Sequence, residues 1–208
     1  MYRDNLSSQL LSDAVDAFSS LPGIGKKSAM RLALHLLKQP EDKVEKFAMA
    51  FVNLRRNILY CDRCNMISDS PKCPICSDNS RDNSVICVVE SYRDVISIEN
   101  TSQYRGVYHV LGGIISPMDG IGPSDLKIDS LIERVKQDKN IREIVMALST
   151  GMEGETTSLY LYRKLAPYDI VVSAIARGVG FGDDLEYTDE LTLGRSILNR
   201  QLYKPDNY

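Results

Sequence analysis

Four cysteines within sixteen residues constrain the fold of this chain more than any other feature of its sequence. They are spaced Cys61-x2-Cys64-x8-Cys73-x2-Cys76. Two Cys-x2-Cys pairs can bring four thiolates to one tetrahedral ion at about 2.3 Å, and four sulfurs with no open position make a structural rather than a catalytic site. We expect one structural Zn²⁺ per chain, and an iron–sulfur cluster is the alternative.

The cellular compartment can also be predicted from the sequence. The chain starts with a charged and polar stretch, residues 1–5, without the apolar segment of a signal peptide. No uncharged apolar run approaches the ~18 residues that a membrane span needs. Clustered cysteines in such a chain indicate metal ligation rather than disulfides. The fifth cysteine, Cys87, lies in an apolar run and is expected to be a buried structural residue. We therefore predict a cytoplasmic protein with no membrane partner.

Charge is distributed unevenly along the 208 residues, whose net charge is −3. Residues 1–58 carry nine basic and six acidic residues, whereas residues 81–208 carry 14 basic and 19 acidic ones. The protein is therefore not a globally basic nucleic-acid binder. The N-terminal third is the better candidate for a nucleic-acid contact.

A glycine turn in that third separates two predicted helices, at about 6–20 and 26–38. Gly23 and Gly25 permit positive φ, and such a turn can aim backbone N–H groups at an anion beside the next helix N-terminus. Lys26 and Lys27 stand at the positive end of that helix dipole, which suits them only if an anion such as phosphate joins them. Arg31 lies one turn beyond Lys27 on the polar face. These residues match the helix-hairpin-helix motif, which grips the nucleic-acid backbone without reading bases.

After residue 85, apolar segments of strand type alternate with amphipathic helices, which indicates a parallel α/β sheet. The predicted strands lie at Val85–Val89, Val107–Leu111, Ile144–Leu148 and Ile170–Ala174. The predicted helices lie at 92–100, 128–138 and 155–166, and a last helix starts at about 189 with Thr188 as its cap. A further helix at 41–57 precedes the cysteines and carries an apolar stripe that includes Phe47 and Phe51.

Acidic residues follow two of these strands. Glu90 ends the first strand, and Glu153 and Glu155 follow the strand that ends at Leu148. This is the edge of an open α/β sheet where ligands usually bind. The segment resembles the acidic loop of Toprim domains, but Ser149 and Gly151 stand where catalytic members have two aspartates. The alternative role for the two glutamates of the loop is favourable placement at a helix N-terminus. We expect Mg²⁺ binding here to be weak or absent.

The order of helix-hairpin-helix, four-cysteine finger and Toprim segment resembles the bacterial recombination mediator family RecR. The likeness covers nearly the whole chain and includes the stretches 108–113, 116–117, 120–123 and 185–193. It implies a non-catalytic DNA-repair factor that works with RecO, and in some bacteria RecF, to load RecA onto gapped single-stranded DNA. It also implies a ring-like tetramer, a nucleoid-associated location, DNA contacts by Lys27 and Arg31, and partner contacts by Glu90 and the Glu153–Glu155 loop.

The predicted fold is thus an α+β multidomain protein. We expect a helix-hairpin-helix domain at 1–57, a four-cysteine zinc finger at 58–80, a Toprim domain at 81–176 and an oligomerisation segment at 177–208. The alternative function is that of a Mg²⁺-dependent Toprim enzyme, a primase or nuclease, with the ion at Glu90.

Overall fold

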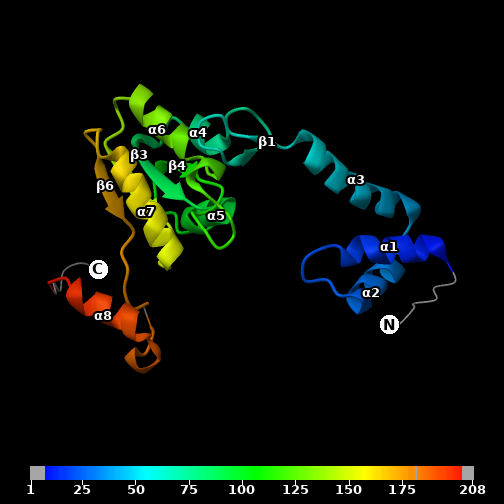
Figure 1. Cartoon of the computed structure of the whole chain (residues 1–208). Coiled ribbons are helices and arrows are strands. Elements are labelled where there is room, and N and C mark those ends of the chain that lie inside the picture. Colours follow the sequence, from blue (N-terminus) through cyan, green and yellow to red (C-terminus); the bar gives the residue numbers. More distant parts are fainter. Residues whose placement is uncertain (1–7, 181, 203–208) are drawn as a thin grey trace. The chain divides into compact units, whose positions relative to one another are not determined.

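The computed structural model describes residues 8–180 and 182–202, and the chain divides into two compact units, Met1–Ile58 and Leu59–Tyr208 (Figure 1). Residues 1–7, 181 and 203–208 lie outside the described range. The expected start of the first helix at residue 6, and the N-terminal stretch used to argue against a signal peptide, fall among them. Each unit is described by itself below.

The described residues of the N-terminal unit form three helices, α1 (Gln9–Ser19), α2 (Lys26–Leu37) and α3 (Glu41–Asn57). Helices α1 and α2 pack through Val15, Ala29 and Ala33, all buried. The two alanines have small side chains, so the helix backbones can approach closely, and partly buried Phe18 packs against this cluster.

Helix α3 is different, because none of its residues is buried. Its apolar stripe is present as expected, but Phe47, Phe51 and Leu54 are 43%, 59% and 57% exposed. The rings of Phe47 and Phe51 contact each other edge-on, with centroids 5.0 Å apart. An aromatic stripe of this size open to solvent is unusual on a monomer surface.

The second unit is built on a four-stranded parallel sheet with the order β4-β3-β5-β6. The alternation of strands and helices expected from the sequence is confirmed, with the helix at 92–100 at its expected bounds and the other elements shifted at one or both ends by one to three residues. The strands are β3 (Asp82–Val89), β4 (Gly106–Val110), β5 (Glu143–Ala147) and β6 (Val171–Ala174). The helices between them are α5 (Tyr92–Asn100), α6 (Ile128–Gln137) and α7 (Met152–Leu165).

The central strand β3 is buried on both faces, as its apolar run predicts. Ile86 and Val88 belong to the larger core, which the buried residues of α6 and α7 complete. Cys87 and Val89 point to the opposite face, where they meet Val95 of α5. The expected burial of Cys87 is confirmed, and burial raises the pKa of its thiol to about 12.

Two local expectations are corrected. Helix α7 begins at Met152 rather than at 155, so Glu153 and Glu155 lie in its first turn. The last helix, α8 (Glu190–Leu198), is capped by Asp189 and not by Thr188, because the Asp189 carboxylate accepts a hydrogen bond from the Thr192 backbone N–H at 2.9 Å. Two short 3-10 helices lie at Pro123–Asp125 and Leu185–Tyr187.

Candidate metal centre and nucleic-acid interface

The cysteine segment folds as two small knuckles. Strands β1 (Leu59–Tyr60) and β2 (Ile67–Ser68) form an antiparallel hairpin, and α4 (Pro74–Ser77) makes a single helical turn. The first knuckle turns at Asn65, which adopts a left-handed conformation with φ 59°. The four cysteines lie at the ends of these two turns, and their side chains point toward one another.

The four predicted ligands are brought to one point. The Sγ atoms of Cys61, Cys64, Cys73 and Cys76 all lie within 4.8 Å of one another, and all four residues are buried. The Cys64 and Cys73 sulfurs are 3.6 Å apart. Sulfurs around a tetrahedral Zn²⁺ at ~2.3 Å would be about 3.8 Å apart, so the arrangement fits the ion closely. In the described part of the chain, these cysteines are the only group of three or more His, Cys, Asp or Glu side chains close enough to hold a metal.

Local hydrogen bonds favour thiolates at this site. The backbone N–H of Cys73 donates to Cys61 Sγ at 3.3 Å, and that of Cys76 donates to Cys73 Sγ at 3.4 Å. In the metal-free cluster, the hydrogen bond between Cys64 and Cys73 raises the pKa of the first thiol and lowers that of the second, as expected when two sulfurs share one proton. A bound metal ion takes the place of that proton.

The finger is docked on the free edge of the sheet. The backbone N–H of Val110 on edge strand β4 donates to the Cys64 carbonyl at 2.8 Å. Met66 and Ile75 of the finger pack against the core on the α5 face. Arg63 donates to Asn83 at 3.0 Å and forms an ion pair with Asp138 at 3.3 Å. The finger and the Toprim segment therefore form one packed structure.

Four cations lie close to the cysteines in the sequence and could offset the negative charge of a metal tetrathiolate: Arg55, Arg56, Arg63 and Lys72. Of these, Arg63 is already paired with Asp138, and Lys72 is exposed. Arg55 and Arg56 lie in the last turn of α3, in the other unit. The buried cation next to the finger is instead Arg134 of α6, which the sequence reasoning missed.

The glycine turn opens α2 as expected, with one difference. Gly23 has φ 79°, but Gly25 is extended with φ −80° and serves as the N-cap of α2. As a glycine, this N-cap residue offers no side chain to cap the helix, and the first intrahelical bond runs from the Ala29 N–H to the Gly25 carbonyl at 3.0 Å. In any α-helix the first N–H groups have no intrahelical acceptor, so the start of α2 is the kind of helix end that can bind an anion.

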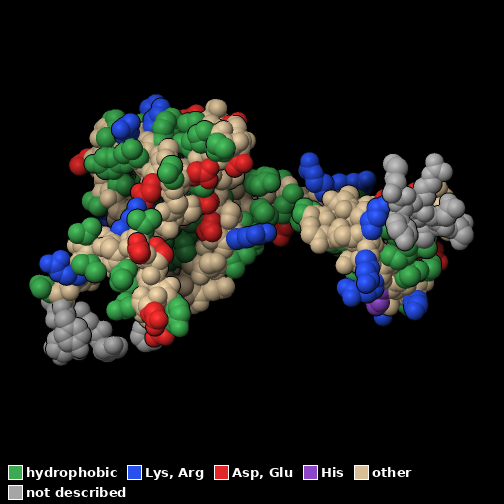
Figure 2. All heavy atoms as spheres, turned by 60° about the horizontal axis from the view of Figure 1, so that its bottom comes forward, with side chains coloured by type: hydrophobic (Ala, Val, Ile, Leu, Met, Phe, Trp, Pro, Cys, Tyr) green, Lys and Arg blue, Asp and Glu red, His purple; other side chains and the backbone are tan. Residues whose placement is uncertain are grey.

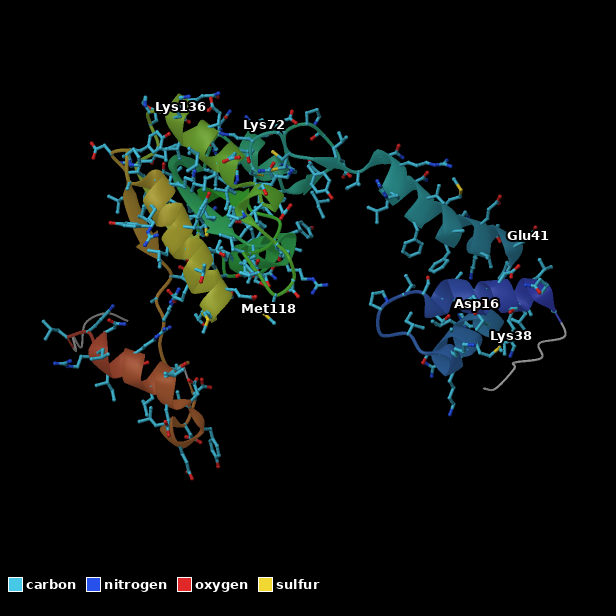
Figure 3. The ribbon with its side chains drawn as sticks, viewed as in Figure 1. Asp16, Lys38, Glu41, Lys72, Met118 and Lys136 are labelled. Atoms are coloured by element: carbon cyan, nitrogen blue, oxygen red, sulfur yellow. The ribbon has the colours of Figure 1, made fainter. Side chains whose placement is uncertain are left out.

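A basic concave surface follows this turn along α2. It has a volume of about 590 Å³, and its polar lining is Lys27, Ser28, Arg31, His35 and Lys38. Lys27 and Arg31 are both exposed. Figure 2 shows Lys and Arg side chains gathered on this side of the N-terminal unit, and Lys38 is labelled in Figure 3. The two apolar residues that line this surface differ in burial: Met30 is half-buried against the α1–α2 core, whereas Leu34 is 40% exposed.

The three Toprim glutamates do not converge on one point. Glu90 Oε1 accepts a hydrogen bond from the Ser149 backbone N–H at 2.5 Å, which bridges the carboxyl ends of β3 and β5. Glu153 accepts one from the hydroxyl of buried Ser116. Glu155 forms ion pairs with Arg177 and Arg195 in the C-terminal part of the chain, the second at 3.7 Å.

Several residues at these sites could not be found from sequence. Ser116, Arg177 and Arg195 meet the glutamates only through tertiary contacts. Arg134 did leave a signal, because it lies with Leu131 and Val135 on the core-facing side of an amphipathic helix, where a charged residue is out of pattern.

Comparison with known domain families defines the class of protein. Residues 11–54 match the family described as "RecR, helix-hairpin-helix", and residues 58–78 match the RecR zinc finger domain with four cysteine ligands. Residues 84–176 match the Toprim domain, and residues 178–201 match "RecR, C-terminal". None of the helices in the described residues combines the length and apolar character of a membrane-spanning segment.

Whole-chain relatives give the family itself. The chain is 61% identical over 194 residues to Recombination protein RecR of Porphyromonas gingivalis strain W83, covering 93% of each chain. It is 58% identical over 193 residues to that of Parabacteroides distasonis, with 93% and 92% covered. It is 54% identical over 194 residues to that of Flavobacterium psychrophilum, with 93% and 94% covered. The chain therefore belongs to the RecR family of recombination proteins.

Proposed function

We propose that this chain is a non-catalytic, DNA-binding recombination mediator that works with RecO, and with RecF in those bacteria that use it, to help load RecA onto gapped single-stranded DNA. The observation that carries the DNA-binding part is the basic surface of α2, where a helix N-terminus that begins at Gly25 adjoins Lys27 and Arg31. Membership of the RecR family supports the role in recombinational repair.

Phosphate contacts explain how this surface would hold DNA. Backbone N–H groups after the Gly23–Gly25 turn would bind one phosphate, and Lys27 and Arg31 would neutralise its neighbours, with Lys26 at the same helix end. Such contacts do not distinguish bases, so single-stranded, duplex and gapped DNA would all bind without sequence preference.

A salt titration of DNA affinity tests this proposal. The Lys27→Ala/Arg31→Ala double variant should bind every DNA sequence more weakly, and its salt slope should fall by roughly one for each phosphate that is no longer neutralised. The matched control is Lys43→Ala/Lys46→Ala, which removes the same charge from exposed positions of α3. Unchanged affinity and slope in a folded double variant would move the DNA site elsewhere, with Arg55 and Arg56 as the next candidates.

The zinc finger is proposed as a structural part of this protein. Cys61, Cys64, Cys73 and Cys76 would hold one Zn²⁺, which supplies no chemistry of its own because four sulfurs leave it no open position. Elemental analysis should find about one zinc per chain, and iron in its place would favour the cluster alternative.

The enzyme alternative, a Mg²⁺-dependent primase or nuclease, has weaker support. Each of its three candidate ligands already has a different partner: a backbone amide for Glu90, a serine for Glu153 and arginines for Glu155. Incubation of the purified chain with Mg²⁺ and labelled DNA should give no cleavage or priming. An activity that disappears in Glu90→Ala would establish the enzyme instead. Under our proposal, Glu90→Ala keeps DNA binding and weakens association with RecO.

Assembly into a ring-like tetramer completes the proposal. The exposed stripe of α3 and Leu34 would be covered by a second copy of the N-terminal domain, proposed to span 1–57. A further contact from residues 177–208 would close the ring, and the finger at 58–80 and the Toprim domain at 81–176 would form its body. A ring multiplies a few cations per subunit through avidity, which suits a chain whose net charge is −3. Action on DNA places this assembly in the cytoplasm, at the nucleoid.

A further inference from the structure

Arg134 occupies a position where a charged side chain is costly. It lies on α6, whose core-facing residues include Ile128, Leu131 and Val135, and it is only 9% exposed. A buried guanidinium remains in a fold only where a negative group or a full set of hydrogen bonds compensates it.

Its hydrogen bonds account for one nitrogen of three. Nη1 donates to the Tyr108 carbonyl at 2.8 Å, on the free edge of β4, and to the Arg63 carbonyl at 3.3 Å, inside the first cysteine knuckle. Nε and Nη2 are buried and have no hydrogen-bond partner among the described residues. The bonds of Nη1 hold the guanidinium between the sheet edge and the cysteines.

No carboxylate in the described part of the chain forms an ion pair with Arg134. The nearby Asp138 is paired with Arg63 at 3.3 Å. Burial lowers the pKa of Arg134 and the charge of Arg63 lowers it further, whereas the sulfurs of Cys76 and Cys64 raise it more than Asp138 does. Its hydrogen bond to the Arg63 carbonyl, between Cys61 and Cys64 in the chain, holds the guanidinium beside the cysteine cluster, which is therefore the candidate negative group for Arg134.

We propose that Arg134 is the counter-charge of the metal centre. Its guanidinium offsets the net negative charge of the Zn²⁺ tetrathiolate from outside the ligand shell, and its bonds to Arg63 and Tyr108 tie the loaded finger to the sheet edge. Arg134 is thus a positioning residue that couples zinc retention to the stability of the Toprim unit. The inference rests on zinc as the occupant of the four cysteines.

The first test measures zinc release from the full chain into excess chelator. Arg134→Met should release zinc at least tenfold faster than wild type, the lower end of the usual effect of losing an outer-shell partner. Arg134→Lys keeps the charge with fewer donors and should fall between the two. The control is Lys136→Met, which removes the same charge from a side chain of α6 that is 65% exposed and lies at the surface (Figure 3), and it should match wild type.

A second measurement separates charge compensation from ordinary packing. In the cobalt-substituted protein, Arg134→Met should move the sulfur-to-cobalt charge-transfer band to lower energy, because loss of a nearby positive charge raises the energy of the sulfur electrons. With zinc bound, thermal unfolding should show Arg134→Met as clearly less stable than wild type. After zinc removal, this difference in stability should be smaller or absent.

The outcomes are distinct. A wild-type chain without zinc would overturn the metal centre itself. Zinc in the wild type, with equal release rates and band positions in Arg134→Met, would overturn the role of Arg134 alone. The same loss of stability with and without zinc would reduce Arg134 to a packing residue. If Arg134→Met does not fold, Arg134→Gln keeps a donor for the Tyr108 carbonyl without the charge and is subject to the same criteria.

Discussion

At the scale of single residues, His109 shows how burial fixes a protonation state. It lies on β4 with no exposed surface, and its Nε2–H donates to the Lys127 carbonyl at 2.8 Å. Burial lowers the pKa of His109 from 6.5 to about 4, and the positive charge of Arg134 acts in the same direction. The neutral ring is therefore a structural residue and not a base poised for catalysis near neutral pH.

This pKa predicts a pH dependence of stability. Because the unfolded chain binds the proton more readily, the contribution of His109 is complete above pH 6.5 and is lost as the pH falls toward 4, by up to about 3 kcal/mol. His109→Gln keeps a donor for the Lys127 carbonyl but does not titrate, so its urea midpoint should fall less between pH 7.5 and 5 than that of wild type. If the urea midpoints of the two proteins fall equally with pH, the lowered pKa of His109 is contradicted.

The cysteines lead to a second residue-scale prediction. Cys61→Ser should lose zinc and lower thermal stability, since a three-sulfur site no longer satisfies the ion and the finger is packed on the sheet. Cys87→Ser is the control, because Cys87 has no part in the cluster, and its zinc content should stay at wild-type level. Zinc content is measured by elemental analysis and stability by thermal unfolding. Full zinc in Cys61→Ser would show that this cysteine is not a ligand.

At the scale of elements, the periodicity of apolar residues predicted most of the helices and strands. Helices α1 and α2 and the strands of the sheet follow from apolar spacing, because each buries a continuous face. Apolar spacing also predicted α3, although its stripe is exposed in the single chain. The hairpin β1–β2 escaped prediction, since two-residue strands carry no pattern. The start of α7 was placed late because Gly151 and Gly154 are typical of a loop. The partners of the glutamates come from distant segments and leave no local signal.

The glycine between Glu153 and Glu155 supplies an element-scale prediction. A Cβ at Gly154 would overlap the backbone carbonyl of Ser149, so α7 can approach the loop after β5 only without a side chain there. Gly154→Ala should lower the free energy of unfolding by about 2 kcal/mol, measured by urea denaturation. Gly194→Ala, in an exposed helix where a Cβ meets nothing, should be neutral or slightly stabilising. If Gly154→Ala has the same free energy of unfolding as wild type, the loop after β5 can move aside at little cost.

The ion pairs of Glu155 support a prediction for the C-terminal segment. Arg177 begins that segment and Arg195 lies within α8, so one carboxylate of α7 holds both. Glu155→Gln should speed amide hydrogen exchange across residues 178–201 while leaving exchange in β3 unchanged. Glu186→Gln, a neutralisation at an exposed position, is the control. Equal exchange in wild type and Glu155→Gln would mean that packing alone holds the segment.

At the scale of the whole molecule, the proposed assembly accounts for two features of the chain: its few cations for DNA contact and the exposed apolar stripe of α3. A few cations on one helix face bind DNA weakly at physiological salt, and an overall negative chain adds repulsion. An uncovered stripe on α3 would be a liability for solubility. Both features suit an assembly that covers the stripe and presents several copies of the basic surface to one DNA molecule.

The last prediction tests this link between surface and assembly. Phe47→Ser/Phe51→Ser should leave each chain folded, because both rings are largely exposed within it, but should weaken self-association by tenfold or more, since buried aromatic side chains dominate subunit interfaces. Sedimentation velocity at micromolar concentration should show a smaller species than wild type, and DNA affinity should fall with it although no cation has changed. Met49→Ser, on another face of the same helix and 43% exposed, is the control and should assemble as wild type does. If the double variant forms an assembly of the wild-type mass, the subunit contact lies away from α3. DNA affinity should then also stay at the wild-type level.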